Sequence, residues 1–494
     1  MSAEWERGGY VRGRALTLAM ITLSLLNVFT LGAGIAVAKL TPDRRLSPWP
    51  PTVAGREVVL AAAGQPGVDR AARVPDAGVL ATRLNALIGG PGEKINAVVI
   101  DATTRRILFQ QRADRPATPA STTKLVTSVA ALAALGPTHR ITTQAVKGGT
   151  GDSVVLVGGG DPTVTARPST SSSSTSPLST SSPGTSSSGT SPSGPGDPAF
   201  ASFTDLARQT ATTLKAAGVR RVRVDFDVSA YQGPRAAASW KPNYLPDGEV
   251  APVSALTVDE GRLAPGNPEQ NTRAGDPPRA AAATFATLLS RHGVKTTAGR
   301  QTRAPAGGQR LGAVQSPTLA EFVEYLMTHS DNDVAEAVLR QVAVKLGQPV
   351  TFAGGAQAVR EILGALGVAD GVLTNDGSGL SPRNQITPLA LARIAALAAS
   401  PERPELRAVV TGMPVAGFSG TLGPPRYRVP GSQAGAGMVR AKTGTLSGVS
   451  TLAGVAYDAD GRLLAFAFMA GDGRGPVDPG KLDRLAGALA ACGC

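Results

Sequence analysis

The stretch PASTTKLVTSVAALAAL, residues 119–135, places Ser121 at the start of an apolar run with helical periodicity and Lys124 three residues later. Serine is favoured at helix N-termini, where its side-chain oxygen accepts a hydrogen bond from a free backbone N–H, so Ser121 could be a helix cap. Residues three apart also share one helix face, so the Lys124 amine could instead lie beside the Ser121 hydroxyl and activate it as a nucleophile. Both interpretations stay open here, because Ser-x-x-Lys arises by chance in a serine-rich chain of this length.

Length and composition indicate a globular protein of two or three domains. The chain has 494 residues, of which 42% are hydrophobic, so it can bury a sizeable core. Its net charge of +13 comes mainly from arginine in a chain rich in Ala, Gly and Pro, which indicates biased base composition. Since no Lys/Arg run is interleaved with aromatic residues, we predict no nucleic-acid binding. A basic surface still favours anionic partners in a cell wall or membrane.

Cysteine and histidine usage argues against a metal site. Cys492 and Cys494 are the two cysteines, so they form neither a disulfide framework nor a four-ligand zinc site. We expect them in a solvated tail, with an intermolecular bridge or a tight local bridge as the alternatives. His139, His292 and His329 are scattered without the H-E-x-x-H spacing. We therefore predict no metal and no cofactor.

The N-terminal region predicts export. Residues 15–38 are 24 residues without a charge, enough to cross a hydrocarbon core of about 30 Å. We predict a transmembrane signal anchor there, with residues 1–14 in the cytoplasm; cleavage after residues 36–38 and secretion is the alternative. Residues 39–79 are Pro-rich and predict a tether. Either route places the remaining chain outside the membrane.

The two ends of the folded region both predict strands and a helix. The segments INAVVID (95–101) and RILFQQ (106–111) predict a hairpin that precedes the Ser121 helix. Residues 449–471 predict a second hairpin turning at DADG, and residues 480–491 predict a closing helix. The fold class that follows is α+β, with an antiparallel sheet flanked by helices and built from both ends of the chain.

A serine-rich segment interrupts the middle of the chain. Residues 167–198 hold no charge between Arg167 and Asp197 and a single apolar residue other than Pro and Gly, Leu178, which predicts a disordered loop. Residues 152–164 and 220–231 on either side have the alternation of strands. The loop is therefore expected inside a domain and not between two domains.

Two further motifs bear on Ser121. In THSDNDVAEAVLRQV (328–342), Ser330 and Asn332 lie between two predicted helices, where Ser330 with Asp333 could be a capping box. In VRAKTGTLSGVS (439–450), Lys442-Thr443-Gly444 could be an ordinary turn into a strand. Each motif alone is a weak signal.

Taken in order, Ser-x-x-Lys, Ser-x-Asn and Lys-Thr-Gly match the motif set of penicillin-binding proteins and serine β-lactamases. The stretches GGGDPT (158–163), APVSALTVDEGR (251–262), TNDGSGLSPRNQITP (374–388) and MPVAGFSGTL (413–422) narrow the resemblance. From about residue 80 to its end the chain resembles the low-molecular-mass class C penicillin-binding proteins, the D-alanyl-D-alanine carboxypeptidase/endopeptidase family.

The resemblance implies a β-lactamase/transpeptidase-like domain split by an inserted β-rich domain. Residues 80–145 and 316–494 would form the two parts of the first domain, and residues 146–315 would form the insertion with its serine-rich loop. The implied function is a serine D,D-carboxypeptidase or endopeptidase that acts on peptidoglycan stem peptides and is inhibited by β-lactams. A serine β-lactamase and a non-catalytic cell-wall-binding scaffold are the alternatives; no E-x-x-x-N stretch of class A β-lactamases lies between the second and third motifs.

The resemblance also implies a role for each motif residue. Ser121 would be the nucleophile, Lys124 its base, and Ser330 the group that passes the proton to the departing amine. Asn332 would hold the substrate amide, and Lys442 and Thr443 would bind its carboxylate. The backbone N–H groups of Ser121 and Thr445 would form the oxyanion hole. Lys124 acts as a base only when neutral, so its pKa must fall from near 10.4 toward about 7 to 8, through burial and the nearby Lys442 cation.

Overall fold

The computed structural model describes residues 72–89, 94–150, 152–168, 197–267 and 270–494. The predicted cytoplasmic tail, signal anchor and most of the tether lie outside the described residues, as does residue range 169–196 of the serine-rich segment. Among the helices that are described, none is long and apolar enough to span a bilayer. The first described helix, α2 (Ala77–Ile88), begins three residues before the expected start of the folded region, with Asp76 as its N-cap.

One antiparallel sheet combines strands from the two ends of the chain. Its order is β10-β11-β12-β1-β2. The strands are β1 (Ile95–Asp101), β2 (Ile107–Gln111), β10 (Val439–Leu446), β11 (Val449–Tyr457) and β12 (Leu463–Gly471). Val99 of β1 lies opposite Phe466 of β12, so the first strand pairs with the last. Both predicted hairpins and the predicted sheet from two chain ends are confirmed.

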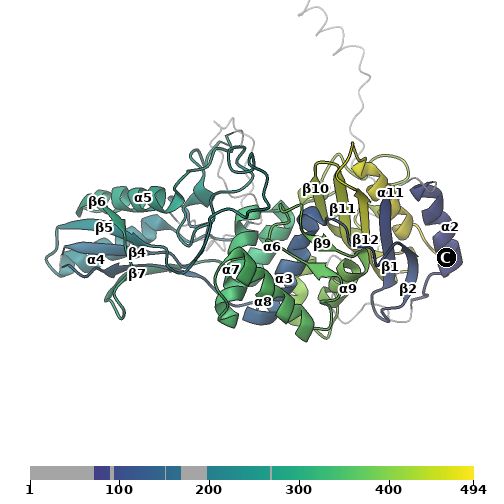
Figure 1. Cartoon of the computed structure of the whole chain (residues 1–494), viewed down its shortest axis with the longest axis horizontal. Helices are drawn as coiled ribbons and strands as arrows, with labels where there is room; N and C mark the ends of the chain where they lie inside the picture. The colour runs from purple at the N-terminus through teal and green to yellow at the C-terminus, as the bar shows by residue number, and fades with distance from the viewer. Residues whose placement is uncertain (1–71, 90–93, 151, 169–196, 268–269) are drawn as a thin grey trace, which may run out of the picture. The chain divides into compact units, whose positions relative to one another are not determined.

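Helices cover both faces of this sheet, which explains why its central strands are apolar throughout. Alternate residues of β1 enter two different cores: Val98 and Ile100 pack into one, whereas Ala97 and Val99 pack into the other. The second core is closed by α2 and α11 (Pro479–Ala490), which contact each other. On the opposite side, α9 (Pro388–Ala398) contacts β1, β11 and β12 (Figure 1).

The helix α3 (Thr123–Leu135) is the centre of a helical layer. Its residues from Thr123 to Leu132 are all buried. It contacts α6 (Leu319–His329), α7 (Asn332–Leu346), α8 (Phe352–Ala365) and α9, and α10 (Arg407–Thr411) joins the same layer. Because α3 is surrounded in this way, any group at its N-terminal end is held in a rigid frame.

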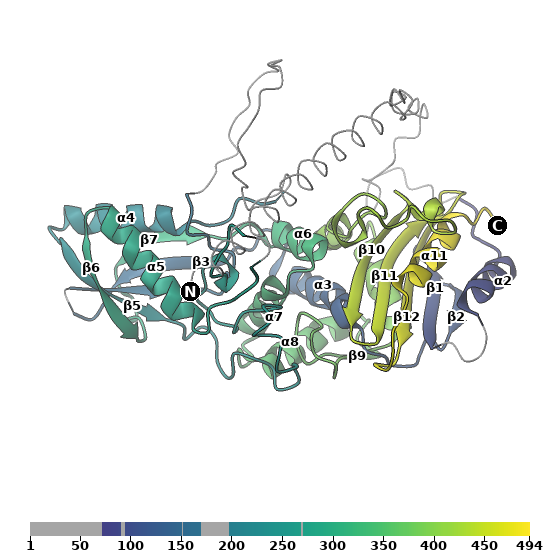
Figure 2. The ribbon, with the colours of Figure 1, turned by 90° about the horizontal axis from the view of Figure 1, so that it is seen from above.

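A second, mixed sheet of order β6-β5-β4-β3-β7 lies in the middle of the sequence. Its strands are β3 (Thr142–Lys147), β4 (Ser153–Val157), β5 (Arg221–Asp227), β6 (Lys295–Gln301) and β7 (Arg310–Gln315). The strands expected in residues 152–164 and 220–231 are present as β4 and β5. Two helices that the sequence analysis did not anticipate, α4 (Phe203–Ala216) and α5 (Pro277–Arg291), pack on this sheet (Figure 2).

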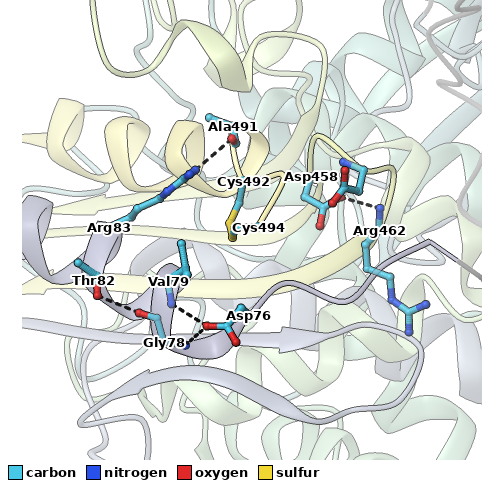
Figure 3. The surroundings of a disulfide bond; sticks show 11 residues. Asp76, Gly78, Val79, Thr82, Arg83, Asp458, Arg462, Ala491, Cys492 and Cys494 are labelled. Carbon is cyan, nitrogen blue, oxygen red and sulfur yellow. Dashed lines mark hydrogen bonds between the residues drawn. A yellow bond between two sulfur atoms is a disulfide. The ribbon is translucent and has the colours of Figure 1, made fainter.

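The C-terminal cysteines correct one expectation. Cys492 and Cys494 are bonded to each other (Figure 3). The Cys492 side chain is fully buried in the core to which α2 and α11 contribute. The backbone of the tail is held too, since Asp76 N donates to Cys494 O at 2.6 Å and Arg83 donates to Ala491 O at 3.2 Å. The expected solvated tail is wrong because the first and last described helices meet there and bury Cys492, although Gly493 stays exposed; the local bridge, one of the alternatives, is the arrangement found.

Candidate active site

Ser121 lies in a tight turn before α3 and does not cap it. The turn is a 3-10 helix, Ala120–Thr122, and within the described chain no side chain caps either this turn or α3. Ala120 has a φ of 48°, a left-handed conformation that costs a residue with a side chain about 1–3 kcal/mol. Thr122 Oγ1 donates to Pro119 O at 2.6 Å and Thr123 Oγ1 donates to Ala120 O at 2.8 Å. These bonds hold the strained turn and leave the half-buried Ser121 hydroxyl available.

Lys124 lies in the first turn of α3 with its ammonium nitrogen beside that hydroxyl. Its Nζ atom is 3.1 Å from Ser121 Oγ, 2.7 Å from Asn332 Oδ1 and 2.7 Å from Ser378 O. A lysine ammonium carries three N–H groups, so these three acceptors occupy all of them. The side chain is fully buried. The geometry expected from the i, i+3 spacing is therefore present.

The second motif forms the junction between α6 and α7. Ser330 ends α6 with a φ of 61°, and Asp331 is the N-cap of α7, with its side chain accepting from Val334 N at 2.7 Å. The alternative of a Ser330–Asp333 capping box does not occur, because the Asp333 side chain accepts from Ala251 N instead, at 2.8 Å. The junction consequently places Ser330 beside Lys442 and Asn332 beside Lys124.

Asn332 connects this junction to two other parts of the chain. Its Oδ1 atom accepts from Lys124, and its Nδ2 atom donates to Glu249 O at 2.8 Å. Both ends of the amide are thus fixed, so the orientation of the side chain follows from its partners.

The third motif lies on β10, at the edge of the antiparallel sheet. Lys442 is fully buried and donates to Ser330 Oγ and to Thr443 O, each at 2.9 Å. Thr443 Oγ1 is 2.7 Å from Thr421 Oγ1 in the segment before β10. Thr445 is exposed and lies opposite Ser450 of β11. All seven predicted site residues therefore come from the Ser121 turn, α3, the α6–α7 junction and β10.

The open edge of β10 presents backbone groups next to this cluster. Val439 O accepts from Ala416 N at 2.9 Å, and Ala441 N donates to Pro414 O at 3.1 Å, so these two residues face away from β11. Facing alternates along an antiparallel strand, so Thr443 and Thr445 present their backbone N–H and C=O groups on the same outer side.

Burial sets the charge state of the two lysines. It lowers the pKa of Lys124 to about 8, against the opposing effect of Asp331 and other nearby carboxylates. Burial, together with repulsion from the Lys124 charge, lowers the pKa of Lys442 well below its usual value. At pH 7 about one tenth of Lys124 is therefore in the neutral form that a general base needs, far more than for a lysine with an ordinary pKa.

Backbone groups that none of the three motifs predicts complete the site. Ser378 supplies a carbonyl to Lys124, and its loop runs against the Ser121 turn: a side-chain carbon at Gly379, where φ is +87°, would lie 2.0 Å from Ala120 O. Asp376 holds this loop by accepting from Trp240 Nε1 at 2.7 Å. The two glycines in DGSG were the available signal, since a backbone carbonyl has no signature in sequence.

Comparison with known proteins decides the family. The model of the D-Ala-D-Ala carboxypeptidase 3 (S13) family matches residues 80–279 and 266–490. The chain belongs to the S13 family.

Relatives in this family match nearly the whole chain. A carboxypeptidase of Mycobacterium tuberculosis is 35% identical over 454 residues, covering 90% of this chain and 89% of its own. The carboxypeptidase DacB of Mycolicibacterium smegmatis is 34% identical over 495 residues, covering 99% and 98%. The S13 chain also shares its fold with penicillin-binding protein 4 of Haemophilus influenzae, with a TM-score of 0.62, 21% identity and coverage of 84% and 98%. The predicted family and the α+β, β-lactamase-like fold with a β-rich domain are confirmed.

Proposed function

We propose that the chain is a penicillin-binding serine D,D-carboxypeptidase that cleaves D-Ala-D-Ala-type stem peptides of peptidoglycan through an acyl-enzyme on Ser121. The observation that carries this proposal is the 3.1 Å contact between Ser121 Oγ and the Nζ atom of a fully buried lysine whose pKa is about 8. A serine hydroxyl becomes a strong nucleophile when an adjacent base accepts its proton.

In the acylation step, neutral Lys124 takes the Ser121 proton while Oγ attacks the carbonyl carbon between the two D-alanines. The negative charge that develops on the carbonyl oxygen is stabilised by the backbone N–H groups of Ser121 and Thr445. The C–N bond then breaks, and Ser330 relays the proton held by Lys124 to the departing D-alanine amine, which leaves Lys124 neutral and the Ser330 hydroxyl intact. Water later hydrolyses the ester, which releases the shortened peptide and restores Ser121.

Substrate binding uses the groups around this centre. Lys442 and Thr443 bind the terminal carboxylate, and Asn332 holds the penultimate amide. Support comes from the fixed positions of these groups: Lys442 Nζ is 2.9 Å from Ser330 Oγ, and Thr443 Oγ1 is 2.7 Å from Thr421 Oγ1. An oriented cation and hydroxyl match a carboxylate, which accepts several hydrogen bonds.

We place the catalytic part outside the cytoplasmic membrane, held by a signal anchor at residues 15–38. This rests on the uncharged stretch in the sequence and on the peptidoglycan substrate, which lies outside the cell. The division into residues 80–145 with 316–494 and an insertion at 146–315 is part of the same proposal.

The direct test is release of D-alanine from a synthetic stem peptide ending in D-Ala-D-Ala, with Ser121→Ala as the control. We expect turnover by the wild type and none by the variant. Undiminished release by Ser121→Ala, or no release by a folded wild type, would overturn the proposal.

A further inference from the structure

A buried carboxylate that the proposed reaction does not use fixes the loop behind Lys124. Glu336 is fully buried, and its Oε1 atom accepts from Gly377 N at 3.0 Å and from Ser378 N at 2.8 Å. The carbonyl oxygen of the same Ser378 accepts from Lys124 Nζ at 2.7 Å. Two N–H groups of one loop thus bind Glu336, while the adjacent carbonyl binds the lysine.

The position of Glu336 on α7 suits this contact. It follows Asn332 by four residues, so both side chains lie on one face of the helix. Asn332 contacts Lys124 directly, and Glu336 reaches it through the loop. The loop is close enough because residue 377 is a glycine: a side-chain carbon there would lie 2.5 Å from Ala335 O.

The partners of Glu336 indicate more than a stabilising ion pair. Its Oε2 atom is 3.8 Å from Arg340 Nη1, and in the described part of the chain neither of these two atoms has a hydrogen-bond partner. The guanidinium carbon of Arg340 instead lies 3.9 Å from the centre of the Phe352 ring. A neutral side chain with the same acceptor oxygen, such as glutamine, could also accept from the two loop N–H groups, and a buried, incompletely paired carboxylate is costly, so stability alone does not require a charged group here.

Charged groups from several elements act on this region. Burial and Asp376 raise the pKa of Glu336 to about 7, against the effect of Arg340. Lys124 faces one other cation, Lys442 on β10. It also faces four carboxylates, each of which raises its pKa: Asp376 in the loop, and Asp331, Asp333 and Glu336 on or beside α7. Removing the Glu336 charge should therefore lower the pKa of Lys124 further.

We propose that Glu336 is a positioning residue: it clamps the Gly377–Ser378 segment so that the Ser378 carbonyl holds Lys124 Nζ beside the Ser121 hydroxyl. This inference rests on the proposed roles of Ser121 and Lys124. The clamp has two separable properties, the reach of the side chain and its negative charge.

Two conservative variants separate these properties when the rate of acylation by a fluorescent penicillin is measured against pH. Glu336→Asp keeps the charge and shortens the reach, so the maximal rate should fall roughly tenfold, which corresponds to one weakened hydrogen-bonded contact, while the pH profile keeps its midpoint. Glu336→Gln keeps the reach and removes the charge that Glu336 carries above its pKa of about 7, so the midpoint of the rising arm should move to lower pH. Glu361→Gln, at an exposed position of α8 where the carboxylate accepts from two glutamines, should change neither.

Rates are expressed per labelled site, so a smaller folded fraction does not imitate the effect. Hydrogen exchange of the wild type gives a second readout that needs no variant: the Gly377 and Ser378 amides should exchange slowly, and fast exchange there would contradict the clamp. Wild-type rate and midpoint in both Glu336 variants would overturn the inference while the proposed function stands. A folded wild type that takes no label would instead overturn the proposed function itself and, with it, this inference.

Discussion

A side-chain carbon placed at Gly444 of β10 would lie 2.9 Å from the backbone nitrogen of Ser121 and 2.7 Å from Pro119 O. The strand of the third motif therefore packs directly on the turn of the nucleophile. Thr451 of β11 reinforces the contact, since its Oγ1 atom donates to Pro119 O at 2.8 Å. This close approach brings the Ser121 N–H next to the outer edge of β10, where the N–H of Thr445 is presented.

Gly444→Ala should consequently displace the Ser121 turn, because two of the three nearest atoms belong to backbone and cannot rotate away. We expect acylation by penicillin to fall at least roughly tenfold, with a loss of stability of about 1–3 kcal/mol. Stopped-flow labelling and thermal unfolding check both effects. Gly149→Ala, where an added carbon meets no atom, is the control; equal behaviour of the two variants would refute the packing argument.

The pH dependence of acylation follows from the lowered pKa of Lys124, about 8. Lys124 accepts the Ser121 proton only when neutral, so the rate should rise with pH up to about 8 and then level off. Below that pH it should fall about tenfold for each unit. The measurement is the second-order rate constant of a fluorescent penicillin across the pH range. A rate that is constant from acidic pH to pH 8 would contradict the role of Lys124 as base.

Lys442→Gln tests the carboxylate site. A buried ammonium beside a carboxylate contributes a few kcal/mol, whereas an exposed pair gives about 1 kcal/mol or less, so hydrolysis should fall strongly. A substrate amidated at its terminal carboxylate should already be poor with wild type and should lose little more in the variant, since both changes delete one interaction. If the variant instead loses equal activity toward the free-acid and the amidated substrate, and its pH profile moves to higher pH, the main role of Lys442 is to lower the pKa of Lys124 and not to bind the carboxylate.

A buried ion pair between two hairpins predicts acid sensitivity. Arg462, at the β11–β12 turn, donates to both carboxylate oxygens of Asp101 at the end of β1, at 2.5 and 3.0 Å. The pKa of Asp101 is lowered: burial opposes the shift, but the bonds from Arg462 and Thr104 outweigh it. A lowered carboxyl pKa adds stability at neutral pH that is lost as pH falls through the folded-state pKa.

Arg462→Met should therefore lower the free energy of unfolding by about 3–5 kcal/mol at neutral pH, because it leaves Asp101 buried without its partner. The difference from wild type should shrink in acid. Arg484→Met, which removes an exposed pair with Asp478, is the control and should cost about 1 kcal/mol or less. Urea unfolding at neutral and at acidic pH measures these differences. Equal losses of unfolding free energy in the two variants at neutral pH would contradict the account.

The parts of this fold that depend on residues close together in the sequence could be predicted from sequence patterns. The β1–β2 hairpin, the β11–β12 hairpin and the Ser121–Lys124 pair follow from alternation and helical spacing within a few residues. The burial of Cys492 could not be predicted in the same way, since it depends on α2 and α11 meeting although residues 89–478 separate them in the sequence. A polar tail and an enclosed one have the same local pattern.

In the site, too, some groups could be predicted from the sequence and others could not. Side-chain roles at Lys442 and Asn332 were predicted from motif order, whereas the carbonyl groups of Ser378 and Glu249 that bind Lys124 and Asn332 were not. Every residue has a backbone carbonyl, so sequence does not distinguish the one that binds a catalytic lysine. Only the three-dimensional path of the loop shows it.

The central claim is that Ser121 is the nucleophile, and the direct measurement is the site of covalent attachment of penicillin. The protein is incubated with a fluorescent penicillin, digested, and the labelled peptide is sequenced by mass spectrometry. We predict a single adduct on Ser121, absent from a folded Ser121→Ala variant with an unchanged melting temperature. An adduct on another residue, or labelling that persists in Ser121→Ala, would contradict the account.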